Sequence, residues 1–210
     1  MNLQGISLEA FESRYGVVDV GRAICGFTPA RDTSVVLALL VHARPRRIVE
    51  IGTAAGHMTA NLTEWSSDEA MIYSLGTVAD VPGTIGHPQE CENPPREHFG
   101  RLANHFGKVH KVFFITADSL TYDFHRLAPI DFAFIDGAHE YHHVLSDSLK
   151  IYRELSPQGC MVWHDFDSPV AWVQVRQALL ETHFVEPIYH VLGTEVAFLD
   201  RGHQPLVISH

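Results

Sequence analysis

Apolar residues follow two different spacings along the chain, and the alternation of these spacings predicts the order of strands and helices. Five short apolar runs have the length and composition of buried strands: 48–51, 71–75, 112–116, 130–136 and 159–163. Six longer segments repeat apolar residues every three or four positions and predict helices: 28–45, 57–65, 96–106, 119–127, 141–155 and 170–180. Strands that alternate with helices in this way form a parallel sheet with helices on both faces.

The last part of the chain breaks this alternation. Two apolar runs, 184–191 and 196–199, flank Gly193 and Thr194 with no helix between them, which predicts an antiparallel hairpin. The fold class predicted from the whole pattern is therefore α/β, a three-layer α/β/α sandwich with an antiparallel edge.

One domain is expected to account for most of the chain, because 210 residues are enough for a single large core. We assign this domain to residues 28–200. Residues 1–27 include a short predicted helix, 7–15, and are interpreted as an N-terminal cap or lid, whereas residues 201–210 form a tail. The Pro- and Gly-rich stretch 77–98 is too long for an ordinary connection, and we interpret it as a flap beside a site.

Composition narrows the possible functions. Hydrophobic residues make up 46% and charged residues 19% of the chain, as is typical of a globular protein. The formal net charge of −10 argues against nucleic acid as a partner, because such binding depends on neutralising phosphates. No apolar run is long enough to span a membrane, and the first residues lack the features of a signal peptide.

The cysteines point to a reducing environment. Cys25, Cys91 and Cys160 are odd in number, far apart and without the spacing of a zinc site. This argues against a disulfide framework, so we expect a cytoplasmic location. A homodimer is one arrangement that we consider, because the N-terminal segment can use the surface of a partner.

The stretch from Glu50 to Gly56 is the first candidate for chemistry. A predicted strand ends at Gly52 and a predicted helix follows Gly56, so a tight glycine turn lies at the carboxyl end of a strand. Ligands bind over such turns in parallel α/β sheets, and the free N–H groups at the start of the helix favour a negative group. The spacing Gly-x-x-x-Gly differs from the Gly-x-Gly-x-x-Gly of dinucleotide-binding proteins. A purely structural turn is the alternative.

Acidic or polar residues also follow three other predicted strands. Their positions are Asp118, Asp136 and the pair His164-Asp165. Each carboxylate alone can serve as a cap or turn residue. Because the carboxyl ends of parallel strands share one edge of the sheet, we expect these residues to converge there with Glu50.

Several of these stretches resemble a known family. The glycine turn resembles the first motif of class I S-adenosylmethionine (SAM)-dependent methyltransferases, E/D-x-G-x-x-x-G. The segments IDGAHEY at 135–141, LSPQGC at 155–160 and WHDF at 163–166, together with Asp147, resemble methyltransferase family 24, a group of small-molecule methyltransferases. The resemblance extends over about residues 28–199. It implies a Rossmann-like, seven-stranded sheet with SAM bound across its carboxyl edge.

The resemblance also implies roles for individual residues. The implied cofactor-binding residues are Glu50, Gly52, Thr53, Ala54, Gly56, Asp118, Ser119 and Asp136, with Asp118 and Ser119 beside the adenine. The implied metal is Mg²⁺, which prefers oxygen ligands. Its candidate ligands are Asp136, Asp165 and His164, although His164 stands where some relatives have a carboxylate.

Besides His164, two further positions depart from the family pattern. Ala138 occupies a position where several metal-dependent relatives have a further Asp, so that candidate base is missing. His139 is then the candidate general base, with Asp136 as its catalytic neighbour, because an imidazole can accept a proton near neutral pH. A histidine that only bonds the backbone at a helix start is the alternative. Gly76 ends the second strand, where the family usually has an acid that binds the ribose.

The predicted function is SAM-dependent methyl transfer to a small-molecule acceptor, with oxygen as the expected target atom. Ala138 and Gly76 keep open a SAM-binding enzyme of other chemistry, such as cyclisation or elimination. A non-catalytic SAM-binding or regulatory module is a further alternative. A nicotinamide-dependent oxidoreductase fits poorly, because the glycine spacing differs and no strand-end acid marks a ribose site.

Overall fold

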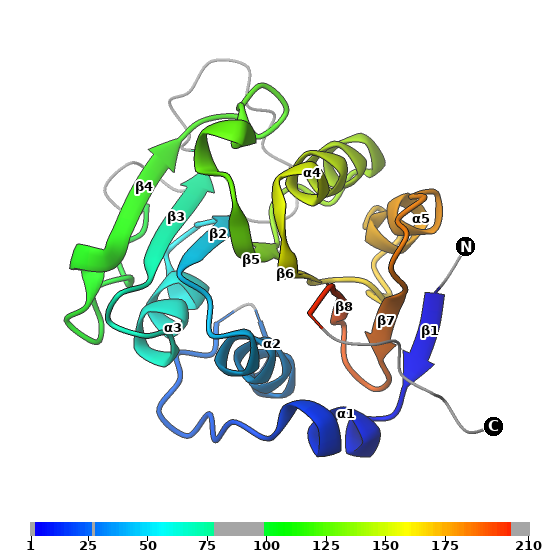
Figure 1. Cartoon of the computed structure of the whole chain (residues 1–210), viewed down its shortest axis with the longest axis horizontal. Helices are drawn as coiled ribbons and strands as arrows, with labels where there is room; N and C mark the ends of the chain where they lie inside the picture. The colour runs from blue at the N-terminus through cyan, green and yellow to red at the C-terminus, as the bar shows by residue number, and fades with distance from the viewer. Residues whose placement is uncertain (1–2, 27, 78–98, 203–210) are drawn as a thin grey trace.

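Eight strands form one sheet, and their order places the carboxyl ends of the central strands beside one another (Figure 1). The computed structural model describes residues 3–26, 28–77 and 99–202. Across the sheet the order is β4-β3-β2-β5-β6-β8-β7-β1, and β8 alone runs antiparallel to its neighbours among the described strands. The strands are β1 Leu3–Ile6, β2 Arg47–Ile51, β3 Met71–Gly76, β4 Val112–Thr116, β5 Ile130–Ile135, β6 Leu155–Trp163, β7 Ile188–Val191 and β8 Ala197–Asp200.

Helices cover both faces of this sheet. Figure 1 shows α1, α2 and α3 on one face and α4 and α5 on the other. The helices are α1 Leu8–Tyr15, α2 Ala30–Ala43, α3 His57–Trp65, α4 Tyr141–Glu154 and α5 Val175–Leu180, with short 3₁₀ helices at Val109–Lys111 and Phe124–Leu127. The structure therefore confirms the predicted three-layer sandwich and its antiparallel hairpin.

The central strands are apolar on both sides because each side meets a helix layer. In β2, Ile48 belongs to the core under α2 and α3, whereas the next residue, Val49, belongs to the core under α4 and α5. β5 alternates in the same way, with Phe132 and Phe134 on the first side and Ala133 on the second. This two-sided burial explains why the strands appear in the sequence as continuous apolar runs.

The sheet has eight strands rather than the seven that the resemblance implies. The additional strand, β1, pairs in parallel with β7 at the edge of the sheet. Its sequence, Leu-Gln-Gly-Ile, is too short and too polar to predict a strand. Residues 3–15 also contribute to the core, since Phe11 packs against Phe198 at a ring distance of 5.8 Å. The interpretation of residues 1–27 as a cap or lid stays a prediction. Within this segment Gly26 lies against the ring of His57.

The prediction of a helix at 96–106 is wrong for residues 99–106, the part of this segment that the structure describes. This segment forms a series of turns, in which N–H groups of Ala103 and His105 donate to carbonyls three residues earlier. Gly100 and Gly107 have φ angles of +63° and +73°, and such left-handed residues interrupt a helix. Most of the predicted flap, 78–98, lies outside the described residues.

Two other predicted helices are shorter than expected. In 119–127 only Phe124–Leu127 is helical, because the side chains of Asp118 and Asp123 accept hydrogen bonds from backbone N–H groups two residues on. In 170–180 the helix begins at Val175. The N–H of Gln174, just before it, donates to the carbonyl of His139, which ties this segment to the start of α4.

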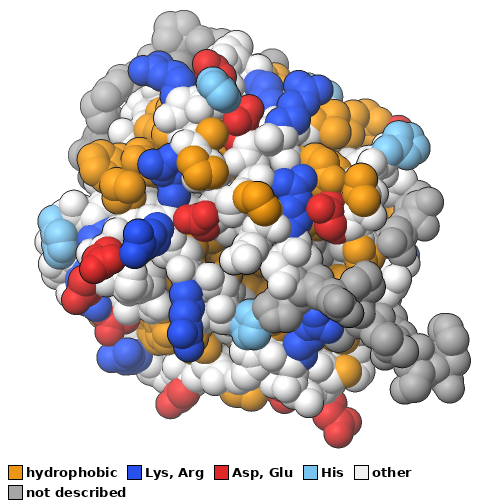
Figure 2. All heavy atoms as spheres, viewed as in Figure 1, with side chains coloured by type: hydrophobic (Ala, Val, Ile, Leu, Met, Phe, Trp, Pro, Cys, Tyr) orange, Lys and Arg blue, Asp and Glu red, His pale blue; other side chains and the backbone are white. Residues whose placement is uncertain are grey.

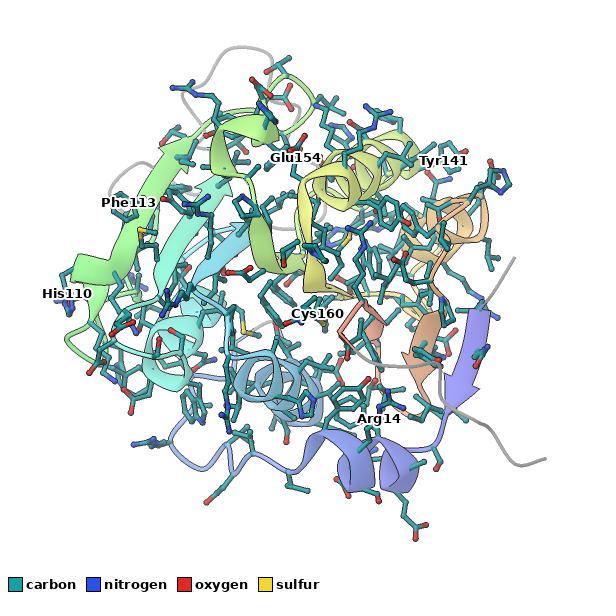
Figure 3. The ribbon with its side chains drawn as sticks, in the orientation of Figure 1. Arg14, His110, Phe113, Tyr141, Glu154 and Cys160 are labelled. Atoms are coloured by element: carbon teal, nitrogen blue, oxygen red, sulfur yellow. The ribbon has the colours of Figure 1, made fainter. Side chains whose placement is uncertain are left out.

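The outer surface shows no single dominant feature on the face drawn in Figure 2, where apolar, basic and acidic side chains are interspersed. Phe113, labelled on the edge strand β4 in Figure 3, is 49% exposed, whereas Cys160 lies within the core. Cys25 and Cys160 are free thiols, and Cys91 lies outside the described residues. Within the described ranges, no helix combines the length and the apolar character needed to cross a membrane.

Candidate functional site

The turn between β2 and α3 requires glycine at its first position. Gly52 has a φ angle of +108°, and a Cβ atom there would lie 1.9 Å from the carbonyl oxygen of Asp136. The N–H of Gly52 donates to the carbonyl of Leu75 at 2.8 Å, which holds the turn beside β3. Gly56, with a φ angle of +86°, directly precedes α3. The turn therefore packs the end of β2 against the end of β5 at the carboxyl edge of the sheet.

Glu50 is a fully buried carboxylate in β2 beside this turn. Its Oε2 accepts hydrogen bonds from Thr59 at 2.6 Å and from Ser74 at 2.5 Å, and Ser74 also bonds Thr53 at 2.7 Å. Its Oε1 is buried and has no hydrogen-bond partner among the described residues. Burial raises the pKa of Glu50 to about 7, although the hydrogen bonds from Ser74 and Thr59 oppose the shift. Glu50 therefore offers a buried acceptor atom to a donor on a ligand.

We expect the Glu50→Gln variant to lose a pH dependence of stability that the native protein shows. The pKa of Glu50 is about 7 when folded and 4.5 ordinarily, so its contribution to stability is present below pH 4.5 and is lost as the pH rises through 7. Glutamine keeps the shape and stays neutral. Between about pH 5 and pH 8, urea unfolding should show the native protein losing roughly 2–3 kcal/mol relative to the variant. Equal pH profiles would contradict this result.

Asp118 and Ser119 follow β4, at the predicted adenine end of the site. The hydroxyl of Ser119 donates to the carboxylate of Asp147 on α4 at 3.0 Å, and Lys150 donates to the Ser119 carbonyl at 2.8 Å. Burial raises the pKa of Asp147 to about 7, and its Oδ1 has no hydrogen-bond partner among the described residues. α4 therefore fixes Ser119, while the role of Ser119 beside an adenine stays a prediction.

The end of β3 offers no carboxylate. A Cβ atom at Gly76 would lie 3.0 Å from the ring of Phe99 and 3.1 Å from Oγ1 of Thr53. The space beside Gly76 is thus occupied by protein, so the ribose-binding acid typical of the family has no equivalent at this position.

The ends of β5 and β6 bring three of the predicted residues together, and we name Asp136, His139 and Asp165 the Asp–His–Asp group. Nε2 of His139 lies 2.9 Å from Oδ2 of Asp165 and 3.7 Å from Oδ1 of Asp136. One atom from each residue lies within 4.8 Å of the other two, so the group could hold a metal ion. Asp165 has a φ angle of +58°, which is uncommon outside glycine.

Opposite charges determine the protonation of this group. Burial lowers the pKa of His139, but its interactions with the carboxylates of Asp136 and Asp165 outweigh burial and raise this pKa to about 10. Burial raises the pKa values of Asp136 and Asp165, yet His139 and His164 hold both below their usual range. His139 is therefore an imidazolium at neutral pH in this state, and it cannot accept a proton until its carboxylate partners are neutralised.

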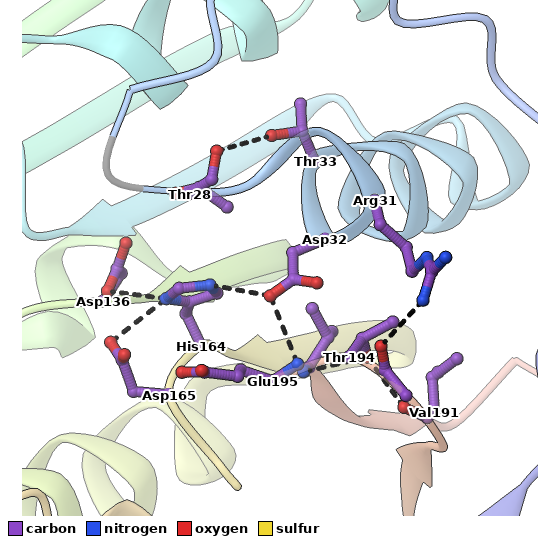
Figure 4. Close-up of polar contacts among 12 residues, drawn as sticks. Thr28, Arg31, Asp32, Thr33, Asp136, His164, Asp165, Val191, Thr194 and Glu195 are labelled. Carbon is purple, nitrogen blue, oxygen red and sulfur yellow. Dashed lines mark hydrogen bonds and ion pairs between the residues drawn. The ribbon is translucent and has the colours of Figure 1, made fainter. Parts of the chain in front are cut away.

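His164 does not join the group as a free ligand. Figure 4 shows its ring between α2 and the end of β6, with Nε2 3.1 Å from Oδ2 of Asp32 and Nδ1 3.1 Å from Oδ2 of Asp165. Burial lowers the pKa of His164, but the negative charge of Asp136 and the hydrogen bonds that the carboxylates of Asp136, Asp165 and Asp32 accept outweigh burial and raise this pKa to about 12. Both ring nitrogens of His164 are thus engaged by carboxylates.

Asp32 is a buried neighbour of the candidate site that the sequence analysis missed. It is 3% exposed in the first turn of α2, and its Oδ2 also accepts the N–H of Glu195 at 3.2 Å. It thereby joins α2, the end of β6 and the segment before β8. An acidic residue in the first turn of a helix ordinarily indicates a favourable interaction with the helix dipole. The position of Asp32 in the sequence therefore indicated a role at the start of a helix and gave no sign of its contact with His164.

We expect Asp32→Ala to lower the free energy of unfolding by about 3–5 kcal/mol, because it removes one partner of a buried ion pair and leaves the N–H of Glu195 unsatisfied. Asp32→Asn keeps an acceptor oxygen of the same shape and should cost distinctly less. Urea denaturation of both variants measures the difference. A loss in Asp32→Ala no larger than that of an ordinary surface substitution would show that this contact does not stabilise the fold.

The comparisons with known proteins agree with this geometry. A family described as "Methyltransferase domain" matches residues 49–166, the stretch from β2 past β6. The search of curated proteins finds no match. Among solved structures, the cofactor-bound protein Rv0187 from MTB has a TM-score of 0.61 at 15% identity, covering 93% of this chain and 88% of that one.

Two structures of O-methyltransferases show the same fold. TomG from Streptomyces achromogenes, involved in tomaymycin synthesis and solved with SAM, has a TM-score of 0.58 at 18% identity, over 90% of this chain and 86% of that one. An O-methyltransferase from Bacillus cereus, solved with S-adenosylhomocysteine (SAH), has a TM-score of 0.56 at 15% identity, over 82% and 81%. Since the family match spans more than half of the sequence and the fold superposes on these structures, the chain belongs to methyltransferase family 24 and has the class I methyltransferase fold.

Proposed function

We propose that the chain transfers the methyl group of SAM to a hydroxyl oxygen of a small molecule. The observation that carries this proposal is the close packing of the glycine turn against Asp136, a member of the Asp–His–Asp group. A cofactor over the turn and an acceptor at the group would be neighbours. TomG and the Bacillus cereus enzyme, both O-methyltransferases, support oxygen as the target atom.

The residues around the turn fit SAM. The unpartnered Oε1 of Glu50 is a buried acceptor suited to an ammonium group, as in the methionine part of SAM. The backbone of the turn from Gly52 to Gly56 and the amino end of α3 suit its carboxylate. In this proposal Thr53 and Ala54 line the same turn, and Asp118 and Ser119 meet the adenine.

The chain has two tasks in the reaction, to hold the hydroxyl in line with the methyl group and to take up its proton. SAM supplies a methyl group on a positively charged sulfur and leaves as SAH. The lowered pKa of Asp136 keeps it ionised at neutral pH, so it can accept a hydrogen bond from the hydroxyl. His139 can act either as proton acceptor, once its carboxylate partners are neutralised, or as a ligand to a cation.

A divalent cation would be held by the Asp–His–Asp group. Two carboxylates and an imidazole with atoms within 4.8 Å of one another are a suitable donor set. A bound cation would lower the pKa of the acceptor hydroxyl and orient it. In this proposal His139 takes the place that the sequence assigned to His164, because Asp32 and Asp165 engage both nitrogens of His164.

We propose a small acceptor because the acceptor has to reach the Asp–His–Asp group at the carboxyl edge of the sheet. The net charge of −10 disfavours nucleic acid as the acceptor. The acceptor's identity depends on loops at this edge, which vary most among such folds. A homodimer and a cytoplasmic location stay predictions from the sequence.

Calorimetry with SAM and SAH tests the cofactor, and mass spectrometry of incubations with phenols, catechols and sugars tests the chemistry. We expect SAM to bind, and a reactive acceptor to gain one methyl group as SAH appears in equal amount. Failure to bind SAM, with and without a divalent cation, would refute the proposal. SAM consumption without SAH would favour cyclisation or elimination, and SAM binding without turnover of any acceptor would favour a regulatory module.

A further inference from the structure

We infer that His139 is a metal ligand, and that the Asp–His–Asp group takes a first-row transition ion such as Mn²⁺ or Co²⁺ in preference to Mg²⁺. The inference deepens the proposed function, since it concerns the same site. It departs from the magnesium site with His164 as a candidate ligand that the family resemblance implies, and it rests on three features of the structure.

The first feature is the spacing of the ligand atoms. Two ligands bound side by side to one ion at about 2.0–2.2 Å lie roughly 2.8–3.6 Å apart in octahedral or tetrahedral geometry. Nε2 of His139 lies 2.9 Å from Asp165, within this range, and 3.7 Å from Asp136, just beyond it. All three atoms lie within 4.8 Å, so small side-chain rotations suffice to bring them to one ion.

The second feature is the state of the His139 nitrogen. Nε2 is buried and lies in ion-pair distance of Asp165, but it makes no hydrogen bond to any described residue. The residue itself is well fixed. Its ring lies 5.7 Å from that of Trp172, and its carbonyl accepts the N–H of Gln174 at 2.9 Å. His139 therefore presents a buried, poorly satisfied nitrogen to two carboxylates.

The third feature excludes the other histidine. His164 is held at Nε2 by Asp32 and at Nδ1 by Asp165, as Figure 4 shows. Ligation through either nitrogen would break a buried hydrogen bond to a carboxylate. His164 is thus a neighbour that orients Asp165, as residues just outside a metal centre commonly do, and His139 is the nitrogen donor.

Donor chemistry then determines which ion is preferred. Mg²⁺ favours oxygen atoms and water, whereas imidazole favours transition ions, whose affinity for mixed nitrogen and oxygen sites rises from Mn²⁺ through Co²⁺. A set of two carboxylates and one imidazole should therefore bind Co²⁺ and Mn²⁺ at least about tenfold more tightly than Mg²⁺.

The test uses the full chain stripped of metal and titrated with Co²⁺, Mn²⁺ and Mg²⁺ by calorimetry, with the visible spectrum of Co²⁺ as a second reading of nitrogen ligation. We expect one tight site for Co²⁺ and Mn²⁺. His139→Ala should weaken Co²⁺ binding by about tenfold or more and Mg²⁺ binding much less. His142→Ala is the matched control, because His142 lies on the neighbouring turn with its ring against His143, outside the group.

The outcomes separate the possibilities. Equal affinities for Mg²⁺ and Co²⁺, or unchanged Co²⁺ binding and spectrum in folded His139→Ala, would overturn the inference. If His139→Ala fails to fold, His139→Gln serves instead. It should show the same loss of Co²⁺ binding, and circular dichroism checks that it is folded. SAM binding by calorimetry on the metal-free protein distinguishes the two proposals: SAM binding without metal binding overturns this inference alone, and metal binding without SAM binding overturns the proposed function alone.

Discussion

Gly52→Ala is expected to abolish SAM binding and to lower the free energy of unfolding by about 2–5 kcal/mol. The added Cβ would lie 1.9 Å from the carbonyl oxygen of Asp136, so the ends of β2 and β5 would have to separate. Overpacking costs about 1–3 kcal/mol, and a side chain at a glycine-only φ angle costs about 1–3 kcal/mol. Calorimetry with SAM and urea unfolding measure the two effects.

Gly16→Ala is the control for Gly52. Gly16 also has a positive φ angle, +84°, but an added Cβ would meet nothing within 4 Å, and the residue follows α1 away from the turn. This variant should show the cost of backbone strain alone and bind SAM normally. Normal SAM binding by a folded Gly52→Ala protein would show that the cofactor does not lie over this turn.

Asp136→Asn is expected to reduce methyl transfer and divalent-cation binding by at least about 100-fold, with a modest effect on stability. The amide keeps the shape of the carboxylate but removes the charge that pairs with His139 and His164 and the oxygen that accepts from the hydroxyl. Cation titration measures binding, and SAH release with an active acceptor measures transfer.

Asp131→Asn provides the matched control at the opposite end of the same strand. Asp131 accepts backbone N–H bonds from Arg46 at 3.1 Å and Arg47 at 3.0 Å, and an amide oxygen can do the same. It should therefore leave both measurements unchanged. If Asp136→Asn binds cations as the native protein does, the edge serves as a wall of the cofactor site and does not hold metal.

The strands and the glycine turn were predictable because local rules determine them. Ile48, Val49 and Ile51 are apolar because both faces of the strand are buried. Gly52 stands where the chain adopts a positive φ angle that other residues rarely adopt. The helix prediction at 96–106 was wrong for residues 99–106 because the apolar spacing is only one of the factors that determine a helix. Its apolar spacing suits a helix, but Gly100 allowed a left-handed turn that spacing alone does not reveal.

The partners within the site were harder to predict than its location. Topology indicated that Asp136 and Asp165 would meet, because both follow neighbouring strands. The contact between His164 and Asp32 spans 132 residues and depends on how α2 packs on the sheet. No local pattern encodes that packing. The sequence therefore predicted that Asp136 and Asp165 would lie together, but it did not reveal that His164 is held by Asp32 and leaves His139 as the nitrogen near both carboxylates.

The pairing of β1 with β7 has a consequence for how the chain is made. Residues 3–6 hydrogen-bond with 188–191, so this strand finds its partner only after the long stretch of chain between the two has been made. During that interval Ile6 and Phe11, both destined for the core, have no sheet to cover them. Closing so long a loop is slow. The nascent chain should therefore depend on chaperones, and a variant that keeps β1 from docking should show its effect first in the yield of soluble protein.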